Sequence, residues 1–440
     1  MLRENLWLLT DEAYKHALMG YLEKKAKRVT EYIQEPLDDF TVEPSTRYSQ
    51  AQPPPDLERD SARALAERLS AVFRRYPDIH EARAGVSLSW SRKYLLTSEG
   101  TRITAGATLP SMLDLWTATR AADGMRLTLH RRWMMNRLAD LPPEAELIKA
   151  AEALAAELIA VRRSPAQMPV SAPALLDPEM TGVLFHEALG HKLEGQRQRD
   201  SQQGQVFRDL VGKKIIPDFI SLWDDPTRES FKGEPLNGFY RYDDEGVPAE
   251  KVVLVDHGVL KNFLMSRWPI KGFSRSNGHG RADFRSRPTG RMANLMVRAD
   301  HPVSRAELKR KLLELTRKAG KPYGLRLVGA FGGENPNSRE AAQTLAVRPR
   351  LVYRVDAKTG EETLVRGVSM VGTPLLMLNR IVAAADDDSI ANGFFCGAES
   401  GTVPVDQIAP SVLVSEIELQ RLAEDLARPP ILASPLHDAP

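Results

Sequence analysis

Apolar residues recur at helical spacing in three stretches of the first part of the chain, 11–34, 56–74 and 143–162. We therefore expect three amphipathic helices, with a polar, proline-bearing connector over 35–55 after the first of them. Each helix should bury one face: Leu18, Tyr21, Leu22 and Val29 in the first, Leu65, Leu69 and Phe73 in the second, and Leu147, Ala151, Leu154, Leu158 and Val161 in the third.

Strand patterns separate these helices and dominate the rest of the chain. Residues 86–90 alternate between apolar side chains and serine, Glu-Gly at 99–100 favours a hairpin turn, and 125–130 predicts a further strand. Later runs such as 252–255 and 325–329 have the composition of buried strands. The second part of the chain is therefore expected to be rich in β-structure.

Two further helices are expected within that second part, at 178–194 and 304–319. A proline-bearing segment at 164–169 marks the expected domain boundary. We predict an α+β fold with an N-terminal α/β domain (1–165), which has long helices and a small sheet. A β-rich C-terminal domain (166–440) comes after it, and the 178–194 helix precedes its strands.

The most specific chemical signal lies in the 178–194 helix, where His186 and Glu187 are followed by His191. Residues four apart on an α-helix are about 40° apart around its axis, whereas residues five apart are about 140° apart. Both histidines can reach one metal ion only if the helix is locally rewound by a π-turn, a feature that clusters at functional sites. We predict such a distortion at Gly190, where glycine lowers its cost. The spacing alone leaves a buried structural role for His186 equally open.

A third metal ligand is needed, because catalytic zinc usually has three protein ligands and an open position. Cys396 is the only cysteine, and it lies where an apolar run meets a glycine, which predicts a strand end before a turn. Its thiolate would complete a His-His-Cys set, while a buried inert thiol or a nucleophile served by a histidine remain alternatives. Glu187 would be the general base, and Glu194 is expected to form an exposed salt bridge or to support a ligand.

Other polar residues carry weaker signals. His257 is expected to be exposed in an Asp-His-Gly turn, and His279 lies in a glycine-rich loop that could touch substrate. Gly332-Gly333 predicts either a β-bulge or a close approach of substrate backbone. For a cluster of four arginines we expect surface salt bridges, with an oxyanion or carboxylate contact as the alternative; its members are Arg281, Arg285, Arg287 and Arg291.

Composition narrows the class of protein. The 60 basic and 58 acidic residues give a net charge of +2, which provides no electrostatic case for nucleic-acid binding. A single cysteine excludes an internal disulfide and suits a reducing compartment. No apolar run approaches the roughly 20 residues that span a bilayer, and the N-terminus lacks a signal-peptide core. We expect a cytoplasmic protein without membrane association.

The same residues resemble the TldD/PmbA family of metallopeptidases, and its TldD side in particular. The resemblance is clear from about residue 165 to the end and weaker over 84–165. The first eighty or so residues match poorly, so we expect N-terminal strands, and with them any export signal, to be missing. The motifs that carry the resemblance are HEALGHKLEG at 186–195, YDDEGVPAEKVVLVDHGVLKNFL at 242–264, GRADFRSRPTGRMANLMV at 280–297, YGLRLVGAFGGENP at 323–336, LVRGVSMVGTPLLMLNRI at 364–381 and CGAESGTVPVDQIAP at 396–410.

The resemblance implies a zinc site and a reaction. By position, His186, His191 and Cys396 would hold zinc and Glu187 would be the base. Family members are intracellular peptidases that act on unfolded or linear peptides as two-subunit assemblies. The resemblance therefore implies a peptide or unfolded-protein substrate, and a homodimer or a heterodimer with a related subunit.

Two rival functions fit the same side chains. One is a cysteine-type hydrolase that uses Cys396 with His186 or His191, and the other is a metal-bound but non-catalytic partner subunit. The intact Glu187 argues against an idle subunit, which would have no need of a base. In the peptidase, the many expected strands would let an extended peptide add as an edge strand.

Overall fold

The computed structural model describes residues 2–30, 37–50, 58–135, 137–199, 207–334 and 344–422. The chain divides into two compact units, Met1–Asp39 and Phe40–Pro440. The first contains helix α1 (Leu2–Thr30), which begins nine residues before the predicted start at 11. The end of the predicted helix, 31–34, lies outside the described residues.

The predicted inner face of this first helix is wrong. Leu18, Tyr21 and Leu22 are 44%, 56% and 53% exposed, and the side chain of Val29 lies outside the described part. Apolar side chains also occur elsewhere around α1, for example at Trp7. A periodic apolar stripe is buried only if a second element covers it. The described residues of Met1–Asp39 include no such element.

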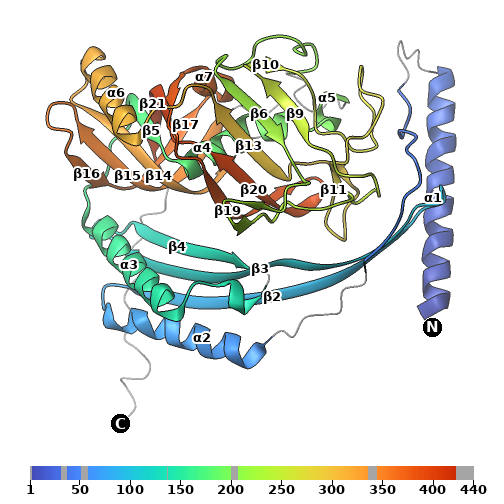
Figure 1. Ribbon diagram of the computed structural model, residues 1–440, viewed down its shortest axis with the longest axis horizontal. Helices are drawn as coiled ribbons and strands as arrows, with labels where there is room; N and C mark the ends of the chain where they lie inside the picture. The colour runs from blue at the N-terminus through green and yellow to red at the C-terminus, as the bar shows by residue number, and fades with distance from the viewer. Residues whose placement is uncertain are drawn as a thin grey trace. The chain divides into compact units, whose positions relative to one another are not determined.

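The second unit begins with a sheet of long strands covered by two helices on one face (Figure 1). Strand β3 is its centre, because it pairs with β1, β2 and β4. The hairpin turn predicted at 99–100 is present, and Gly100 there has a φ of +100°. The elements are β1 (Arg47–Gln50), α2 (Arg59–Val72), β2 (Glu81–Leu96), β3 (Arg102–Arg120), β4 (Arg126–Met135) and α3 (Glu144–Arg163).

Helices α2 and α3 confirm two of the sequence predictions. Leu69, Leu147 and Leu154 are fully buried against the sheet, as helical periodicity predicted. The same apolar cluster includes Leu351, which belongs to a C-terminal strand. The sheet and its helices therefore share an apolar cluster with the C-terminal half of the molecule.

That half contains two larger sheets. The first closes on itself, because β14 pairs with both β5 and β15 at the two ends of the order β14-β5-β21-β17-β15. Helix α6 packs on it, close to the predicted 304–319. Its elements are β5 (Val170–Leu176), α6 (Arg305–Lys318), β14 (Tyr323–Glu334), β15 (Leu345–Asp356), β16 (Glu362–Val365), β17 (Val368–Gly372), α7 (Pro374–Asn379), β18 (Ile381–Ala384) and β21 (Val412–Arg421).

The second sheet has the order β10-β9-β6-β13-β20-β19, and two short hairpins accompany it. The β9–β10 turn is the predicted Asp-His-Gly turn, with His257 at a φ of 45° and its side chain 65% exposed. The strands are β6 (Ile220–Asp224), β7 (Ser230–Phe231), β8 (Glu234–Pro235), β9 (Val252–Asp256), β10 (Val259–Leu260), β11 (Gly280–Arg281), β12 (Thr289–Gly290), β13 (Asn294–Ala299), β19 (Ser389–Ala398) and β20 (Gly401–Ala409).

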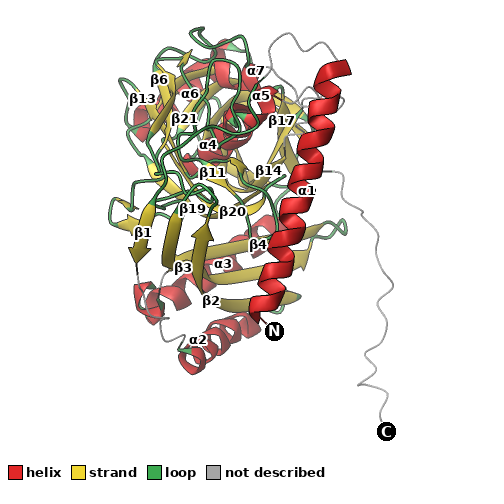
Figure 2. Ribbon diagram, turned by 90° about the vertical axis from the view of Figure 1, so that its right-hand side faces the viewer, coloured by secondary structure: helices red, strands yellow, loops and turns green. Residues whose placement is uncertain are grey.

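Helix α4 (Pro178–Phe185) lies between the two sheets, and Figure 2 shows it among strands and loops. Asp177 caps it by accepting the Met180 N–H at 2.8 Å, and a proline occupies its first turn. Seven of its eight residues are buried. The chain then continues through His186–Leu193 to α5 (Gln196–Arg199), so the histidine motif starts in the middle of the main core.

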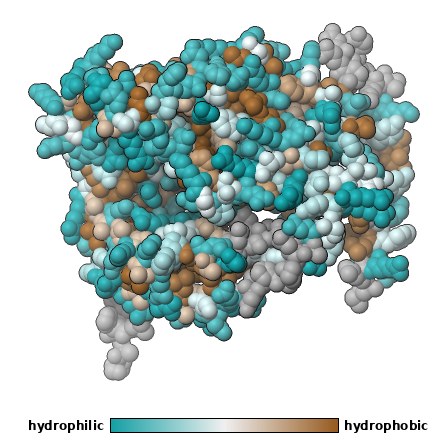
Figure 3. Space-filling model, in the orientation of Figure 1, coloured by the Kyte–Doolittle hydropathy of each residue, from teal (hydrophilic) through white to brown (hydrophobic). Residues whose placement is uncertain are grey.

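The fold class is α+β, as the sequence predicted. None of the described helices is both long and apolar enough to cross a bilayer. On the face drawn in Figure 3, hydrophilic residues predominate and apolar ones are scattered.

Candidate metal centre

The helix changes its winding where the sequence predicts it. Helix α4 ends at Phe185, and His186–Gly190 form a π-helical turn. The His191 N–H donates to the His186 carbonyl oxygen, which is the i→i+5 bond of such a turn. The two imidazole rings therefore share one side of the helix, with centroids 4.9 Å apart and planes at 87°.

Gly190 is required for a reason other than the one the sequence suggested. Its φ of −48° and ψ of −59° are ordinary right-handed helical values, so no special backbone freedom is used. A Cβ on Gly190 would instead lie 2.0 Å from Met292 Sδ. The glycine leaves room for Met292 to pack directly beside the π-turn.

Cys396 lies in β19 and faces both histidines. Its Sγ is 3.1 Å from His186 Nε2 and 3.2 Å from His191 Nε2. All three side chains are buried, and one ligand atom from each lies within 4.8 Å of the others. Two imidazole nitrogens and one sulfur at this separation form a donor set that suits Zn²⁺.

The charges of this group depend on one another. Burial alone would raise the pKa of the Cys396 thiol, but the two facing imidazoles outweigh burial and hold that pKa well below its usual range. Burial likewise disfavours charged His191, yet Glu194 and Cys396 raise the pKa of His191 well above its ordinary value. A thiolate is thus favoured next to the imidazoles, and a thiolate is the form in which cysteine binds metal.

Glu194 supports His191 from inside the protein, so its expected exposed salt bridge is wrong. It is fully buried, and its Oε1 lies 2.9 Å from His191 Nδ1. Because a carboxylate only accepts, the ring donates from Nδ1 and turns Nε2 toward Cys396. Burial would raise the pKa of Glu194, but Arg197 and His191 lower it to about 2. The positive side chains of Arg197 and Arg291 hold this carboxylate ionised.

The arginine cluster divides into buried and exposed members. Arg291 is completely buried. Its guanidinium group donates to the Cys396 carbonyl oxygen at 2.6 Å and to Ser400 Oγ at 2.8 Å. Arg281 is buried as well and donates to a backbone carbonyl oxygen. Surface salt bridges are therefore the wrong expectation for these two arginines, whereas Arg285 and Arg287 are exposed. Arg291 fixes the backbone of the strand that carries the sulfur.

His279, for which the sequence left a contact with substrate open, lies in the interior instead. Its side chain is fully buried, and Nε2 lies 3.2 Å from Asp224 Oδ1. Asp224 in turn accepts the Ala293 N–H. Asp224 of β6 thus links both His279 and Ala293 to the second sheet. His279 therefore has a structural role, which its glycine-rich sequence context does not indicate.

Glu187 is half-buried and packs against Gly333 of β14. A Cβ on Gly333 would lie 2.5 Å from Glu187 Cγ, so only glycine allows this approach. Strand β14 has a β-bulge between Ala330 and Gly332, which confirms one of the two expectations for the glycine pair. Burial raises the pKa of Glu187, while the nearby imidazoles lower it by less.

One neighbour of the site was missed by sequence reasoning. Gln407 of β20 places its amide nitrogen 3.1 Å from His186 Nδ1, although the two residues are 221 positions apart. Gln407 lies inside the 396–410 motif that carries the family resemblance, but nothing in the sequence indicates that its side chain reaches His186. Only the pairing of β20 with β13 and β19 brings it behind the histidine.

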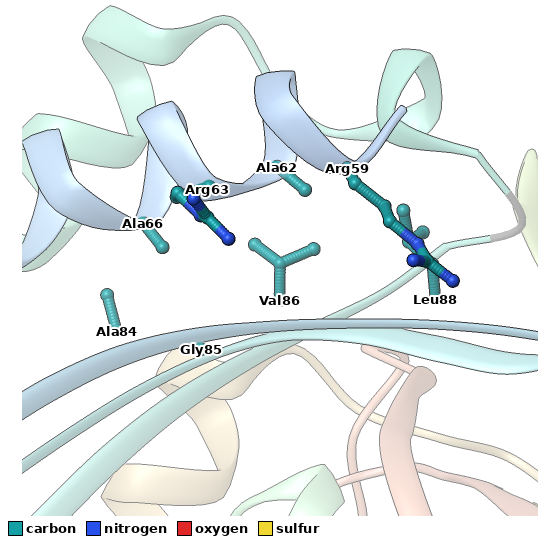
Figure 4. A pocket seen from close by; sticks show the side chains of 8 residues that line it. All are labelled: Arg59, Ala62, Arg63, Ala66, Ala84, Gly85, Val86 and Leu88. Carbon is teal, nitrogen blue, oxygen red and sulfur yellow. The ribbon is translucent and has the colours of Figure 1, made fainter. Parts of the chain in front are cut away.

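A separate cleft of about 410 Å³ lies between α2 and β2 (Figure 4). Arg59 and Arg63 of α2 face small and apolar side chains of β2 across it. Its lining contains no histidine, cysteine or carboxylate. This cleft therefore offers none of the side chains that the proposed metal chemistry needs.

The sequence matches a family model and several metalloproteases. Residues 169–421 match the family model described as the PmbA/TldA metallopeptidase C-terminal domain. A metalloprotease of Methanocaldococcus jannaschii is 32% identical over 236 residues, which are 52% of this chain and 47% of that protein. A zinc metalloprotease TldD homologue of Saccharolobus solfataricus is 28% identical over 249 residues, 56% of this chain and 51% of the relative. The chain thus matches about half the length of these relatives.

Two solved structures share the fold. TldE of Thermococcus kodakarensis aligns with a TM-score of 0.61 and 16% identity, over 88% of this chain and 81% of its own. A putative modulator of DNA gyrase from Thermotoga maritima aligns with a TM-score of 0.63 and 18% identity, over 86% and 79%. Since the family model covers more than half of the sequence, this chain belongs to the TldD/PmbA family of metallopeptidases.

Proposed function

We propose that the chain is a zinc-dependent peptidase that hydrolyses unfolded or linear peptides. His186, His191 and Cys396 would hold the zinc, and the convergence of their three donor atoms is the observation that carries the proposal. When bound, zinc would act as a Lewis acid that polarises a peptide carbonyl and makes water easier to deprotonate. Residues 166–440 would form the peptidase domain. The protein would act in the cytoplasm, as a homodimer or as a heterodimer with a related subunit.

Glu187 is the proposed general base. It follows a proposed ligand directly, so its side chain leaves the helix in another direction than that of His186, and its carboxylate could take a proton. Contact with Gly333 limits the positions that this carboxylate can adopt. In the second half of the reaction the protonated Glu187 would return its proton to the leaving amine.

The variant Glu187→Gln tests this assignment. It keeps the size of the side chain and removes the base, so zinc content should stay at the wild-type level while peptide cleavage falls by about 10²–10⁴-fold. Elemental analysis and a linear fluorogenic peptide provide the two readouts. Wild-type turnover in this variant would refute the proposed role of Glu187.

An extended peptide would enter along β14. Strand β5 pairs only with Leu325–Leu327, whereas β15 pairs with β14 as far as Glu334. Asp177 and Glu179 accept the N–H groups of Gly329 and Ala330. Beyond these residues the described strands leave one edge of β14 unpaired, and Glu187 packs against Gly333 in the same stretch of the strand. Methylation of alternate backbone nitrogens in a substrate peptide should weaken its binding, and an unchanged KM would count against strand addition.

A cysteine-type hydrolase is the second candidate, because the two imidazoles favour the thiolate of Cys396. A metal chelator distinguishes the two functions. The zinc peptidase loses activity with chelator and regains it with added zinc, whereas the cysteine hydrolase is inhibited by alkylation and ignores the chelator. A non-catalytic subunit would show no cleavage in either experiment, and the presence of Glu187 favours the catalytic form.

A further inference from the structure

Gln407 lies directly behind His186 and belongs to the hairpin that also carries Cys396. It is 2% exposed, and it sits on β20, which pairs with β19. Its amide nitrogen is 3.1 Å from His186 Nδ1. One hairpin therefore supplies both the sulfur of the site and the polar neighbour of the first histidine.

The orientation of this amide is at odds with a metal on His186. The Nε2 atom faces the sulfur at 3.1 Å, so it is the nitrogen that would bind the ion and must then carry no proton. The single proton of the neutral ring moves to Nδ1. An Nδ1–H would then point at the N–H₂ group of Gln407, and two donors would face each other without an acceptor.

A second observation identifies the missing acceptor. The Oε1 atom of Gln407 is buried and receives no hydrogen bond from the described residues. Turning the amide by 180° exchanges Oε1 and Nε2 without changing the space that the side chain fills. Oε1 then accepts from His186 Nδ1–H, so the unsatisfied oxygen acquires a donor and the donor conflict disappears.

On the basis of the proposed zinc function, we propose that Gln407 is the positioning residue of His186. Its amide oxygen accepts Nδ1–H and keeps Nε2 bare and directed at the zinc.

The two histidines are therefore supported in different ways. His191 faces the carboxylate of Glu194, which can only accept and fixes one tautomer. His186 faces a neutral amide that fits either tautomer.

Packing holds Gln407 in this place. A Cβ on Gly182 would lie 2.8 Å from Gln407 Cβ, so helix α4 approaches β20 closely only because residue 182 is glycine. Gly182 and His186 are four residues apart and lie on one face of the helix. The contact that brings the two backbones together therefore also sets the distance from the amide to the ring.

Three variants of the full chain test the proposal. Gln407→Leu removes the acceptor, and Gln407→Glu keeps the size and can only accept. Gln167→Leu is the matched control, because Gln167 is also 2% exposed but bonds to Arg354 instead of the site. Zinc affinity is measured by competition with a chromophoric chelator, and nitrogen-15 spectra of the zinc-loaded protein report the Nδ1 proton of His186.

We expect Gln407→Leu to weaken zinc binding about 10–100-fold and to lose the protected Nδ1–H signal. Gln407→Glu should keep the zinc affinity within a few-fold of the wild type and should keep the Nδ1–H signal. Gln167→Leu should change neither the affinity nor the signal. Wild-type affinity in Gln407→Leu, or an equal loss in Gln407→Glu, would overturn the proposal. If Gln407→Leu fails to fold, Gln407→Glu decides alone, since it must retain zinc and the signal. Failure of the zinc function itself looks different: zinc would then remain bound in Cys396→Ser.

Discussion

Two glycines leave the space in which the candidate centre is assembled. Gly190 makes room for Met292 beside the π-turn, and Gly333 makes room for Glu187 beside β14. Neither contact involves a ligand atom, yet both determine where the chemically active side chains can lie. Substitutions at these positions should therefore separate metal binding from catalysis.

Gly190→Ala should weaken zinc binding. The added methyl would overlap Met292 Sδ, so either the methionine or the π-turn must move, and a moved turn displaces His191 relative to His186. We expect at least a tenfold loss of zinc affinity, measured by chelator competition, together with about 1–3 kcal/mol of lost stability from overpacking. Gly85→Ala is the control, because a Cβ there meets nothing within 4 Å. An unchanged zinc affinity in Gly190→Ala would contradict this prediction, because it would mean that the Met292 side chain moves aside and the π-turn stays in place.

Gly333→Ala should affect the reaction instead of the metal. Its methyl would press on Glu187 Cγ and displace the proposed base. We expect kcat on a linear peptide to fall about tenfold or more, since a small misplacement of a catalytic group is costly. Zinc content should remain that of the wild type. A parallel loss of zinc and activity would contradict this separation of roles.

Local segments were predicted well wherever their own sequence carries the signal. Helices α2, α3 and α6 follow from apolar periodicity, the β2–β3 hairpin from its Glu-Gly turn, and the π-turn from the five-residue histidine spacing. The α+β fold class was thus predictable from the sequence, whereas spacing alone left the roles of His186 and Cys396 open and the family resemblance indicated the three converging side chains.

Features that depend on distant contacts were not predictable. The burial of Glu194 and Arg291 results from their mutual approach within the core, and nothing near either residue in the sequence indicates it. Gln407 and His186 meet only because strands pair across the molecule. The prediction that α1 buries an apolar face was wrong. Periodicity shows that a helix has an apolar face, but it does not show whether another element covers that face.

The loop around Asp243 and Glu245 should make stability depend on pH. Burial, and after it the charge of Asp243, raise the pKa of Glu245 to about 8. The folded pKa is above the unfolded value of about 4.3, so this group's contribution is complete below that value and is lost as pH rises toward 8. Glu245 is therefore protonated in the folded protein below about pH 8, and its carboxyl group accepts a hydrogen bond from the Arg267 N–H.

Glu245→Gln should remove this dependence. We expect the variant to be more stable than the wild type at pH 8, by about 1 kcal/mol or more, and equally stable near pH 4.5. Urea unfolding at both pH values measures the difference. Glu99→Gln should behave oppositely and lose stability at neutral pH, because its hydrogen bond with Arg267 lowers the pKa of Glu99. An identical effect of Glu245→Gln at both pH values would refute the assignment.

The ligands proposed for zinc come from two separate parts of the folded chain. The π-turn that continues helix α4, and the short helical turn after it, carry the histidines, and the β19–β20 hairpin brings Cys396 from 205 residues away. An ion bound by both segments would stabilise the folded state over the unfolded chain, by about 2.7 kcal/mol when zinc is at 100 times its Kd. Metal binding and folding of the C-terminal half are therefore coupled.

Elemental analysis of the purified wild-type protein beside Cys396→Ser tests the central claim most directly. The proposed His-His-Cys site predicts one zinc per wild-type chain and a large loss of zinc in the serine variant, because a hydroxyl replaces the thiolate donor. Zinc at full stoichiometry in Cys396→Ser, or none in an active wild-type protein, would contradict it.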